Sequence, residues 1–149
     1  WKQLVAGDCH DLAELYKQVF DSYPFPIFNP DYLRETMDDN IEYLGVYDGD
    51  SLVAAASSEK YPEHGNVEMT DFATLPEYRG KHFGSFLLVK MEELMKEQGF
   101  AVAYTISRAA HIGINVVFAK LGYSFAGTLR NNTNICGSLE SMNVWYKKL

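Results

Sequence analysis

The hydrophobic residues near the N-terminus recur three or four positions apart, which is the spacing of one face of a helix. This pattern runs from residue 8 to residue 20, and Asp8 stands where a capping residue is expected. The apolar face comprises Leu12, Leu15, Val19 and Phe20. A short apolar segment, residues 4–6, precedes the helix and predicts a first strand.

An aromatic loop stiffened by prolines follows over residues 23–30. At its end, Asn29 can cap a second helix and Pro30 can occupy the first helical position, because proline needs no hydrogen-bond partner there. This second helix is short and is expected to extend toward Met37.

The hydrophobic pattern then changes to that of strands, which are predicted at 41–47 and 51–58 with a turn at Asp48-Gly49-Asp50. A third strand is expected at about 67–75, and the longest helix from Gly80 to Gly99. The remaining elements are a strand at 101–107, a helix at 110–121, a strand at 123–129 and a hairpin arm at 139–146. The order β-α-α-β-β-β-α-β-α-β-β predicts a mixed α/β sheet in one domain, residues 1–149, and not a doubly wound nucleotide-binding fold.

Composition narrows the class of partner. Thirteen basic and 20 acidic residues give a formal charge of −7, which argues against nucleic acid or an anionic membrane as partner and favours a cationic acceptor. No apolar run approaches the roughly 20 residues of a membrane span. Cys9 and Cys136 form no CxxC pair, so we expect free thiols in a cytoplasmic protein. The four histidines lack ligand spacing, and no metal is expected.

One segment, residues 71–85, combines a strand, a turn, a glycine-containing loop and the start of the longest helix. The N–H groups of residues 80–84 at the helix start lack partners, and the helix dipole adds partial positive charge, so the segment predicts an anion site. Gly80 and Gly84 would let a phosphate approach the backbone closely. The segment contains neither GxxxxGK[ST] nor GxGxxG. On two glycines alone, a plain helix cap would be the simpler interpretation.

The sequence LPEYRGKHFG, residues 75–84, resembles the acyl-CoA signature [Q/R]-x-x-G-x-[G/A] of the GNAT acetyltransferase superfamily. Arg79 and Gly84 match its first and last positions, whereas His82 stands where the middle glycine is usual. The order of elements is also similar to that of a GNAT domain over essentially the whole chain. The resemblance implies a GNAT fold, with a central mixed, mostly antiparallel sheet flanked by helices, and acetyl-CoA as cosubstrate.

The resemblance also implies which residues bind acetyl-CoA. The pyrophosphate would contact the loop and helix start that comprise Arg79, Gly80, Lys81, His82, Phe83, Gly84 and Ser85. The pantetheine would lie along a splayed strand edge formed by Phe72, Ala73 and Thr74, whose backbone N–H groups would also polarise the thioester carbonyl. For these three residues alone, an ordinary buried strand end would be the simpler interpretation.

Amine acetylation requires a neutral amine, and a lysine-like ammonium is deprotonated only to about one part in 2,500 at pH 7. A carboxylate can accept the proton, directly or through water. Glu68 precedes Arg79 by 79 − 68 = 11 positions, a spacing similar to that of the general base in histone-type GNAT enzymes. Asp71 is the alternative base, although residues three apart on a strand face opposite sides unless a bulge intervenes. A solvated surface carboxylate is an equal interpretation of Glu68.

The general acid of the family is a Tyr four residues before the Gly of Y-x-x-x-G-[FY]. Here that position is Phe118, before Gly122, and it has no hydroxyl. The acid is therefore absent, solvent, or another group such as His111 or Tyr104. For His111, a helix-start residue without a catalytic role is the favoured interpretation.

The acceptor pocket is expected to involve Tyr23 and Phe28 of the aromatic loop, together with the C-terminal hairpin. In that hairpin, Asn131, Asn132 and Asn134 are either turn residues or ligands for the polar end of an amino-acid substrate. Arg108 could bind a carboxylate in a bidentate pair, or could be a solvated residue.

A finer resemblance concerns the acceptor. The segments MTDFATLPEYRGK, AYTISRA, FAKLGY, GTLRNNTNICG and LESMNVWYK are similar to the C-terminal half of β-lysine N6-acetyltransferases. Those enzymes have an additional N-terminal region that is expected to be missing here, and they make N6-acetyl-β-lysine, a compatible solute. The resemblance implies direct attack by the amine in a ternary complex.

Rival interpretations remain open. The acceptor could be a polyamine, an antibiotic or a protein amine, and the domain could instead sense acyl-CoA without catalysis. An acetylated Cys136 is disfavoured because no activating His lies near it in sequence. The expected partner is a small-molecule amine, and a homodimer is compatible with the sequence.

Overall fold

The computed structural model describes all residues, 1–149. Its strands are β1 (Lys2–Gln3), β2 (Ile41–Asp48), β3 (Ser51–Tyr61), β4 (Asn66–Thr74), β5 (Val102–Arg108), β6 (Ser124–Ile135) and β7 (Ser138–Lys148). Its helices are α1 (Cys9–Val19), α2 (Pro30–Asp39), α3 (Phe83–Glu97) and α4 (Ile112–Lys120), with three short 3-10 turns between elements. The order of elements confirms the sequence-based prediction.

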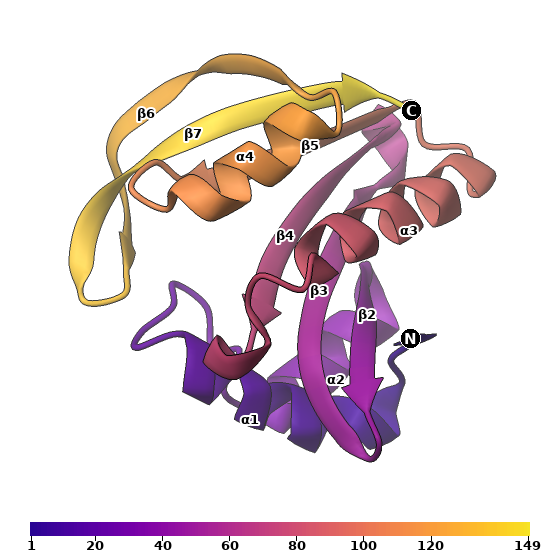
Figure 1. Ribbon diagram of the computed structural model, residues 1–149. Coiled ribbons are helices and arrows are strands. Elements are labelled where there is room, and N and C mark those ends of the chain that lie inside the picture. Colours follow the sequence, from indigo (N-terminus) through magenta and orange to yellow (C-terminus); the bar gives the residue numbers. More distant parts are fainter.

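The strands form one seven-stranded sheet in the order β1-β2-β3-β4-β5-β7-β6, in which only β4 and β5 are parallel. Helices cover both faces (Figure 1). On β3, Val53 and Ala55 pack with α1 and α2, whereas Ala54 and Ala56 pack with α3 on the other face. Successive residues of a strand point to opposite faces, so this one buried strand contributes to both cores. The predicted mixed, mostly antiparallel sheet is confirmed.

The parallel pair β4–β5 is short. Only residues 66–68 of β4 pair with residues 102–104 of β5. Beyond that point the two strands diverge (Figure 1), so the backbone edge of β4 from Met69 onward has no ladder partner on the β5 side. This is the splayed strand edge that the sequence resemblance implies.

A β-bulge interrupts β4 just beyond the pairing with β5. Ala55 pairs with Ala73 and Ser57 pairs with Thr70, so two residues of β4 oppose one residue of β3. Asp71 is one of the two, with a φ of 52°. An extra residue shifts the alternation of side chains by one position, and Asp71 therefore faces the same side as Glu68. Without the bulge the two carboxylates would face opposite sides of the sheet.

Several predicted boundaries are corrected. The first strand is Lys2–Gln3 instead of residues 4–6. Asp8 does not cap α1: it ends a 3-10 turn, and its side chain accepts hydrogen bonds from Val5 N (2.9 Å) and Lys2 Nζ (2.8 Å). Asn29 does cap α2, since its Oδ1 accepts from Asp31 N at 2.9 Å.

Two later elements also differ from prediction. Helix α3 begins at Phe83 instead of Gly80, because Gly80 (φ 81°) and His82 (φ 64°) are both left-handed and cannot continue a right-handed helix. Strand β6 extends to Ile135 instead of Leu129, which places the asparagine-rich segment in an exposed strand. No helix has both the length and the apolar composition that crossing a membrane would require.

Candidate active site

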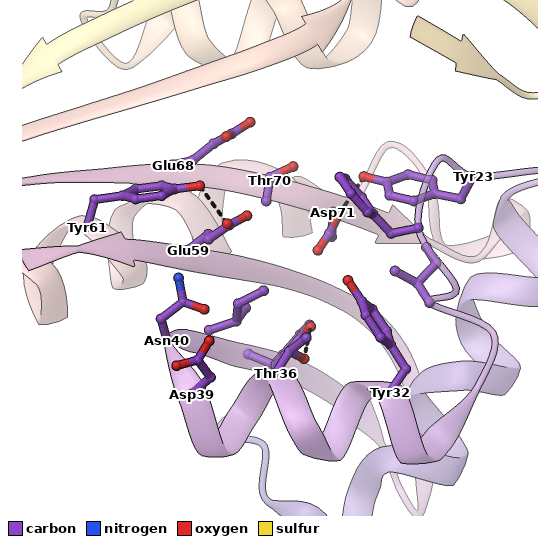
Figure 2. Close-up of a pocket in the computed structure, with 14 residues that line it drawn as sticks. Tyr23, Tyr32, Thr36, Asp39, Asn40, Glu59, Tyr61, Glu68, Thr70 and Asp71 are labelled. Atoms are coloured by element: carbon purple, nitrogen blue, oxygen red, sulfur yellow. Dashed lines mark hydrogen bonds between the residues drawn. The ribbon is translucent and has the colours of Figure 1, made fainter.

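A cavity of about 400 Å³ lies between α2, the loop before it, and strands β3 and β4 (Figure 2). Four carboxylates and four tyrosines are among its lining residues, and neither Lys nor Arg lines it. The lining comprises Tyr23, Phe25, Ile27, Tyr32, Thr36, Asp39, Asn40, Ile41, Tyr43, Glu59, Tyr61, Glu68, Thr70 and Asp71. A cavity with this lining suits a cationic ligand.

Glu68 lies on β4, directly opposite Glu59 of β3 and Tyr104 of β5 in the sheet register. Its pKa is raised to about 7, first by burial and then by the negative charges of Glu59 and Asp71. The Tyr104 hydroxyl partly opposes this rise. A carboxylate that titrates near neutral pH can accept a proton from an ammonium group and pass it on readily.

Asp71 is held by two protein hydroxyls. Its Oδ1 accepts a hydrogen bond from the Tyr23 hydroxyl (2.5 Å) and its Oδ2 accepts from Ser57 Oγ (2.6 Å). Burial raises its pKa, and both hydrogen bonds oppose that rise. Figure 2 shows Tyr23 pointing toward Asp71 from the loop before α2. Because both oxygens have protein partners, Asp71 is better suited to fixing this loop than to accepting a proton.

Tyr104 and His111 were both considered as general acids. Burial and the neighbouring Glu68 raise the pKa of Tyr104 to about 12, so its hydroxyl is protonated at neutral pH and can donate. His111 is exposed at the start of α4, and neither His111 nor Tyr104 lines the cavity. The geometry brings Tyr104 close to Glu68 and leaves His111 apart.

Phe118, at the position where the family has its general-acid Tyr, is fully buried in the core. Its ring packs edge-to-face against Phe72 (5.6 Å between ring centroids) and Tyr123 (5.0 Å). The side chain of Phe72 therefore lies in the core under α3, whereas Ala73 is buried in the core under α1. Phe72, Ala73 and Thr74 therefore present mainly backbone groups along the open edge of β4.

The loop before α3 presents a series of free N–H groups. No backbone acceptor is within hydrogen-bonding geometry of any N–H from Gly80 through Ser85, and the first helical bond of this region runs from Phe86 N to His82 O (3.0 Å). The left-handed φ values of Gly80 and His82 turn the chain here. Free N–H groups at the start of a 15-residue helix form an anion-binding arrangement.

Two cationic side chains flank these N–H groups. Arg79 is exposed and donates from Nε to Thr74 O (3.4 Å). Lys81 is exposed and lies 4.5 Å from the ring centroid of Tyr78. Both remain accessible to an anionic ligand.

The residues expected to bind the polar end of an acceptor are only partly brought together. Asn132 and Asn134 line a second hollow, of about 560 Å³, together with residues 22–25. Tyr23 and Phe25 line both cavities. Asn131 is exposed with a φ of 46° and does not line either.

Arg108 and Phe28 are engaged elsewhere. Arg108 forms a bidentate ion pair with Glu140, at 2.8 Å from Nε and 2.6 Å from the terminal nitrogen. This pair occupies the Nε–Nη2 edge of the guanidinium, and Glu140 already neutralises the charge that a substrate carboxylate would need. Phe28 packs against the core around α1 and α2, and Ile27 and Phe25 line the cavity in its place.

Sequence analysis missed the wall of the cavity that β3 and α2 provide. Glu59 and Tyr61 alternate at the end of β3, after a fully buried run, and that change from apolar to alternating polar residues was a usable signal. Asp39 and Asn40 at the end of α2 carry no comparable signal, because many helix ends are polar. No group of three or more His, Cys, Asp or Glu residues has a geometry that would hold a metal ion.

Comparison with known families gives one match. Residues 9–123 match the family described as "Acetyltransferase (GNAT) family". This range begins at α1 and includes the cavity, the loop before α3 and helix α4.

Two curated relatives are β-lysine N(6)-acetyltransferases. The protein from Methanococcus maripaludis is 46% identical over 94% of this chain and 51% of its own length. The protein from Methanosarcina mazei is 39% identical over 97% of this chain and 54% of its own length. The chain thus spans about half the length of the curated relatives it matches.

A solved structure shows the same fold at lower identity. It is the GNAT superfamily phosphinothricin acetyltransferase from Sinorhizobium meliloti, determined in complex with AcCoA. The two chains superpose with a TM-score of 0.82 at 19% identity, over 99% of this chain and 86% of the other.

Proposed function

Because the chain belongs to the acetyltransferase (GNAT) family, we propose that it transfers an acetyl group from acetyl-CoA to a primary amine of a small molecule, namely N6 of β-lysine. The product is then N6-acetyl-β-lysine, a compatible solute, made in the cytoplasm. The observation that carries acetylation of an amine is the carboxylate-lined cavity beside Glu68. The two relatives named β-lysine N(6)-acetyltransferases support β-lysine as the acceptor.

Acetyl-CoA binding is supported by main-chain geometry. The free N–H groups from Gly80 through Ser85 bind the pyrophosphate, and the exposed Arg79 and Lys81 add positive charge. The pantetheine lies along the unpaired edge of β4 at residues 72–74, whose N–H groups also polarise the thioester carbonyl. The AcCoA complex of the phosphinothricin acetyltransferase supports this use of the fold.

The chemical step is direct attack in a ternary complex. Glu68 accepts a proton from the N6 ammonium, directly or through water, and the neutral amine attacks the thioester carbon. A C–N bond forms, the nitrogen releases its second proton to solvent, and the C–S bond breaks so that the thiolate of CoA leaves. The pKa of the CoA thiol is near that of a free thiol, about 8.5, so the thiolate is a good leaving group. Tyr104, the neighbour of Glu68 in the sheet, or solvent returns a proton to the sulfur, since Phe118 has no hydroxyl and His111 is exposed at the start of α4.

The carboxylate of the acceptor needs donors that the acidic cavity lacks. Asn132 and Asn134 supply amide groups in the adjoining hollow, next to Tyr23 and Phe25. Arg108 would serve only after release from Glu140, and we therefore assign the carboxylate to the asparagines.

A polyamine is the second candidate acceptor. It is favoured by one observation, the absence of Lys and Arg from the cavity lining, because a polyamine carries no carboxylate. A screen of β-lysine, α-lysine and spermidine with acetyl-CoA separates the candidates. We expect β-lysine to have the highest kcat/KM, with mass spectrometry placing the acetyl group on N6. A higher kcat/KM for spermidine or a peptide would overturn the assigned acceptor.

A further inference from the structure

Two carboxylates lie side by side on adjacent strands that border the cavity. Glu59 of β3 and Glu68 of β4 are direct cross-strand partners, and both line the cavity. Cβ atoms of such partners are typically about 4.5–5.5 Å apart, and like charges at this distance destabilise a sheet. Lys60, the neighbouring cation, does not neutralise these two carboxylates, because it is paired with Glu42 at 2.6 Å and does not line the cavity.

Glu59 is held in place by its own strand. The Tyr61 hydroxyl donates to Glu59 Oε1 at 2.5 Å, and no protein donor contacts Oε2. Figure 2 shows Glu59 and Tyr61 on one strand, Glu68 and Thr70 on the next, and Asp39 on the facing wall from α2. An oriented carboxylate with one free oxygen, facing a cavity, is suited to binding a cation from a ligand.

We propose that Glu59 is a specificity-determining residue that binds a second ammonium group of the acceptor while Glu68 faces the reacting one. The proposal rests on the proposed function and names its substrate class: compounds with two amino groups on one chain. In β-lysine the two nitrogens are separated by four carbons, the same spacing as in putrescine. A dication neutralises the opposed carboxylates, so the site favours a diamine over a monoamine of equal length.

A different role for Glu59 would give a different result. If Glu59 acted only by shifting the ionisation of Glu68, its loss would change the acetylation of every amine alike. A contact with the second ammonium affects only substrates that have one. Substrate pairs that differ only in that group therefore separate the two roles.

The test compares the Glu59→Gln variant with the unsubstituted protein on two such pairs. The first pair is β-lysine and 6-aminohexanoate, which lacks only the second amino group, and the other is putrescine and butylamine. We expect Glu59→Gln to lower kcat/KM for each diamine about 10- to 100-fold, as for a lost hydrogen bond to a charged group, and to change each monoamine less than threefold. Glu63→Gln, at an exposed position just after β3, is the control and should change neither.

Each outcome decides the matter. An equal fall for both members of a pair would overturn the proposal in favour of an effect on Glu68. If the unsubstituted protein acetylates putrescine but not β-lysine, the assigned acceptor falls and the diamine inference stands. If no amine is acetylated, calorimetry of putrescine binding still decides: equal affinity for the unsubstituted protein and Glu59→Gln would overturn the inference. Circular dichroism would verify that the variant is folded.

Discussion

The cosubstrate half of the proposed active site is built from backbone groups, whereas the acceptor half is built from side chains. On the cosubstrate side, the loop from Gly80 to Ser85 offers N–H groups, and the edge of β4 offers backbone beyond its pairing with β5. On the acceptor side, side-chain carboxylates and tyrosine hydroxyls from three separate segments surround a cavity. The first arrangement tolerates many side chains, whereas the second depends on each one. Substitutions should therefore have unequal effects on the two halves.

The largest effect is expected on the acceptor side. Glu68→Gln removes the proton acceptor and should lower turnover at pH 7 by about 10²-fold, with acetyl-CoA affinity unchanged. In the unsubstituted protein, the rate should rise with pH through about 7 as Glu68 ionises, and this limb should disappear in the variant. Glu97→Gln, exposed at the end of α3, is the matched control. Unchanged turnover across the pH profile would move the role to Asp71 or solvent.

On the cosubstrate side, a change of backbone should matter more than a change of charge. Gly80 has a φ of 81°, where a β-branched residue is strained, so Gly80→Val should weaken acetyl-CoA binding about tenfold. Lys81→Ala removes an exposed charge and should weaken binding less than about threefold. Isothermal titration calorimetry with acetyl-CoA measures both. A larger loss from Lys81→Ala would contradict main-chain binding.

The thermal stability of the protein should depend on the ionisation of the buried Glu68. The pKa of Glu68 is about 7 in the folded protein, against 4.5 for an ordinary Glu, so the folded state holds this proton more tightly than the unfolded state. Stability contributed by Glu68 is therefore lost as the pH rises from about 4.5 through 7. The Tm of Glu68→Gln relative to that of the unsubstituted protein should increase by a few degrees over this range. Parallel Tm curves measured by calorimetry would refute the assignment.

The smallest effect is expected at His82, where the family signature has glycine. His82→Gly relieves a left-handed φ of 64°, which costs about 1 kcal/mol, but it also increases the entropy of the unfolded chain. The two contributions nearly cancel, and Tm should change by less than about 3 °C. Acetyl-CoA affinity should stay within about twofold. A tenfold loss would instead assign a direct contact to the imidazole.

The backbone geometry of the proposed cosubstrate side was predictable from sequence because its determinants are local. Glycines, a helix start and a strand lie within residues 71–85, and the sequence indicated the loop although it placed the start of α3 three residues early. The acceptor side was only half predictable. The spacing to Arg79 indicated Glu68. The position of Glu59 beside Glu68 depends on the strand register, and Asp71 lies on the same face as Glu68 because of a bulge that no local pattern specifies. For Arg108 the sequence left two alternatives, a substrate carboxylate or solvent, and its pairing with Glu140 depends on the register of β5 and β7.

The brief contact between β4 and β5 has a mechanical consequence for the whole protein. Three residue pairs are the only ladder between the strands on the β1–β4 side and those of the β5–β7–β6 side. A ligand that lies in the gap and pairs with both edges acts as a missing strand and joins the two parts. We therefore expect bound acetyl-CoA to slow amide hydrogen exchange on both sides of the gap, in residues that never touch it. In the proposed complex, the open sheet makes the rigidity of the fold depend on the bound acetyl-CoA.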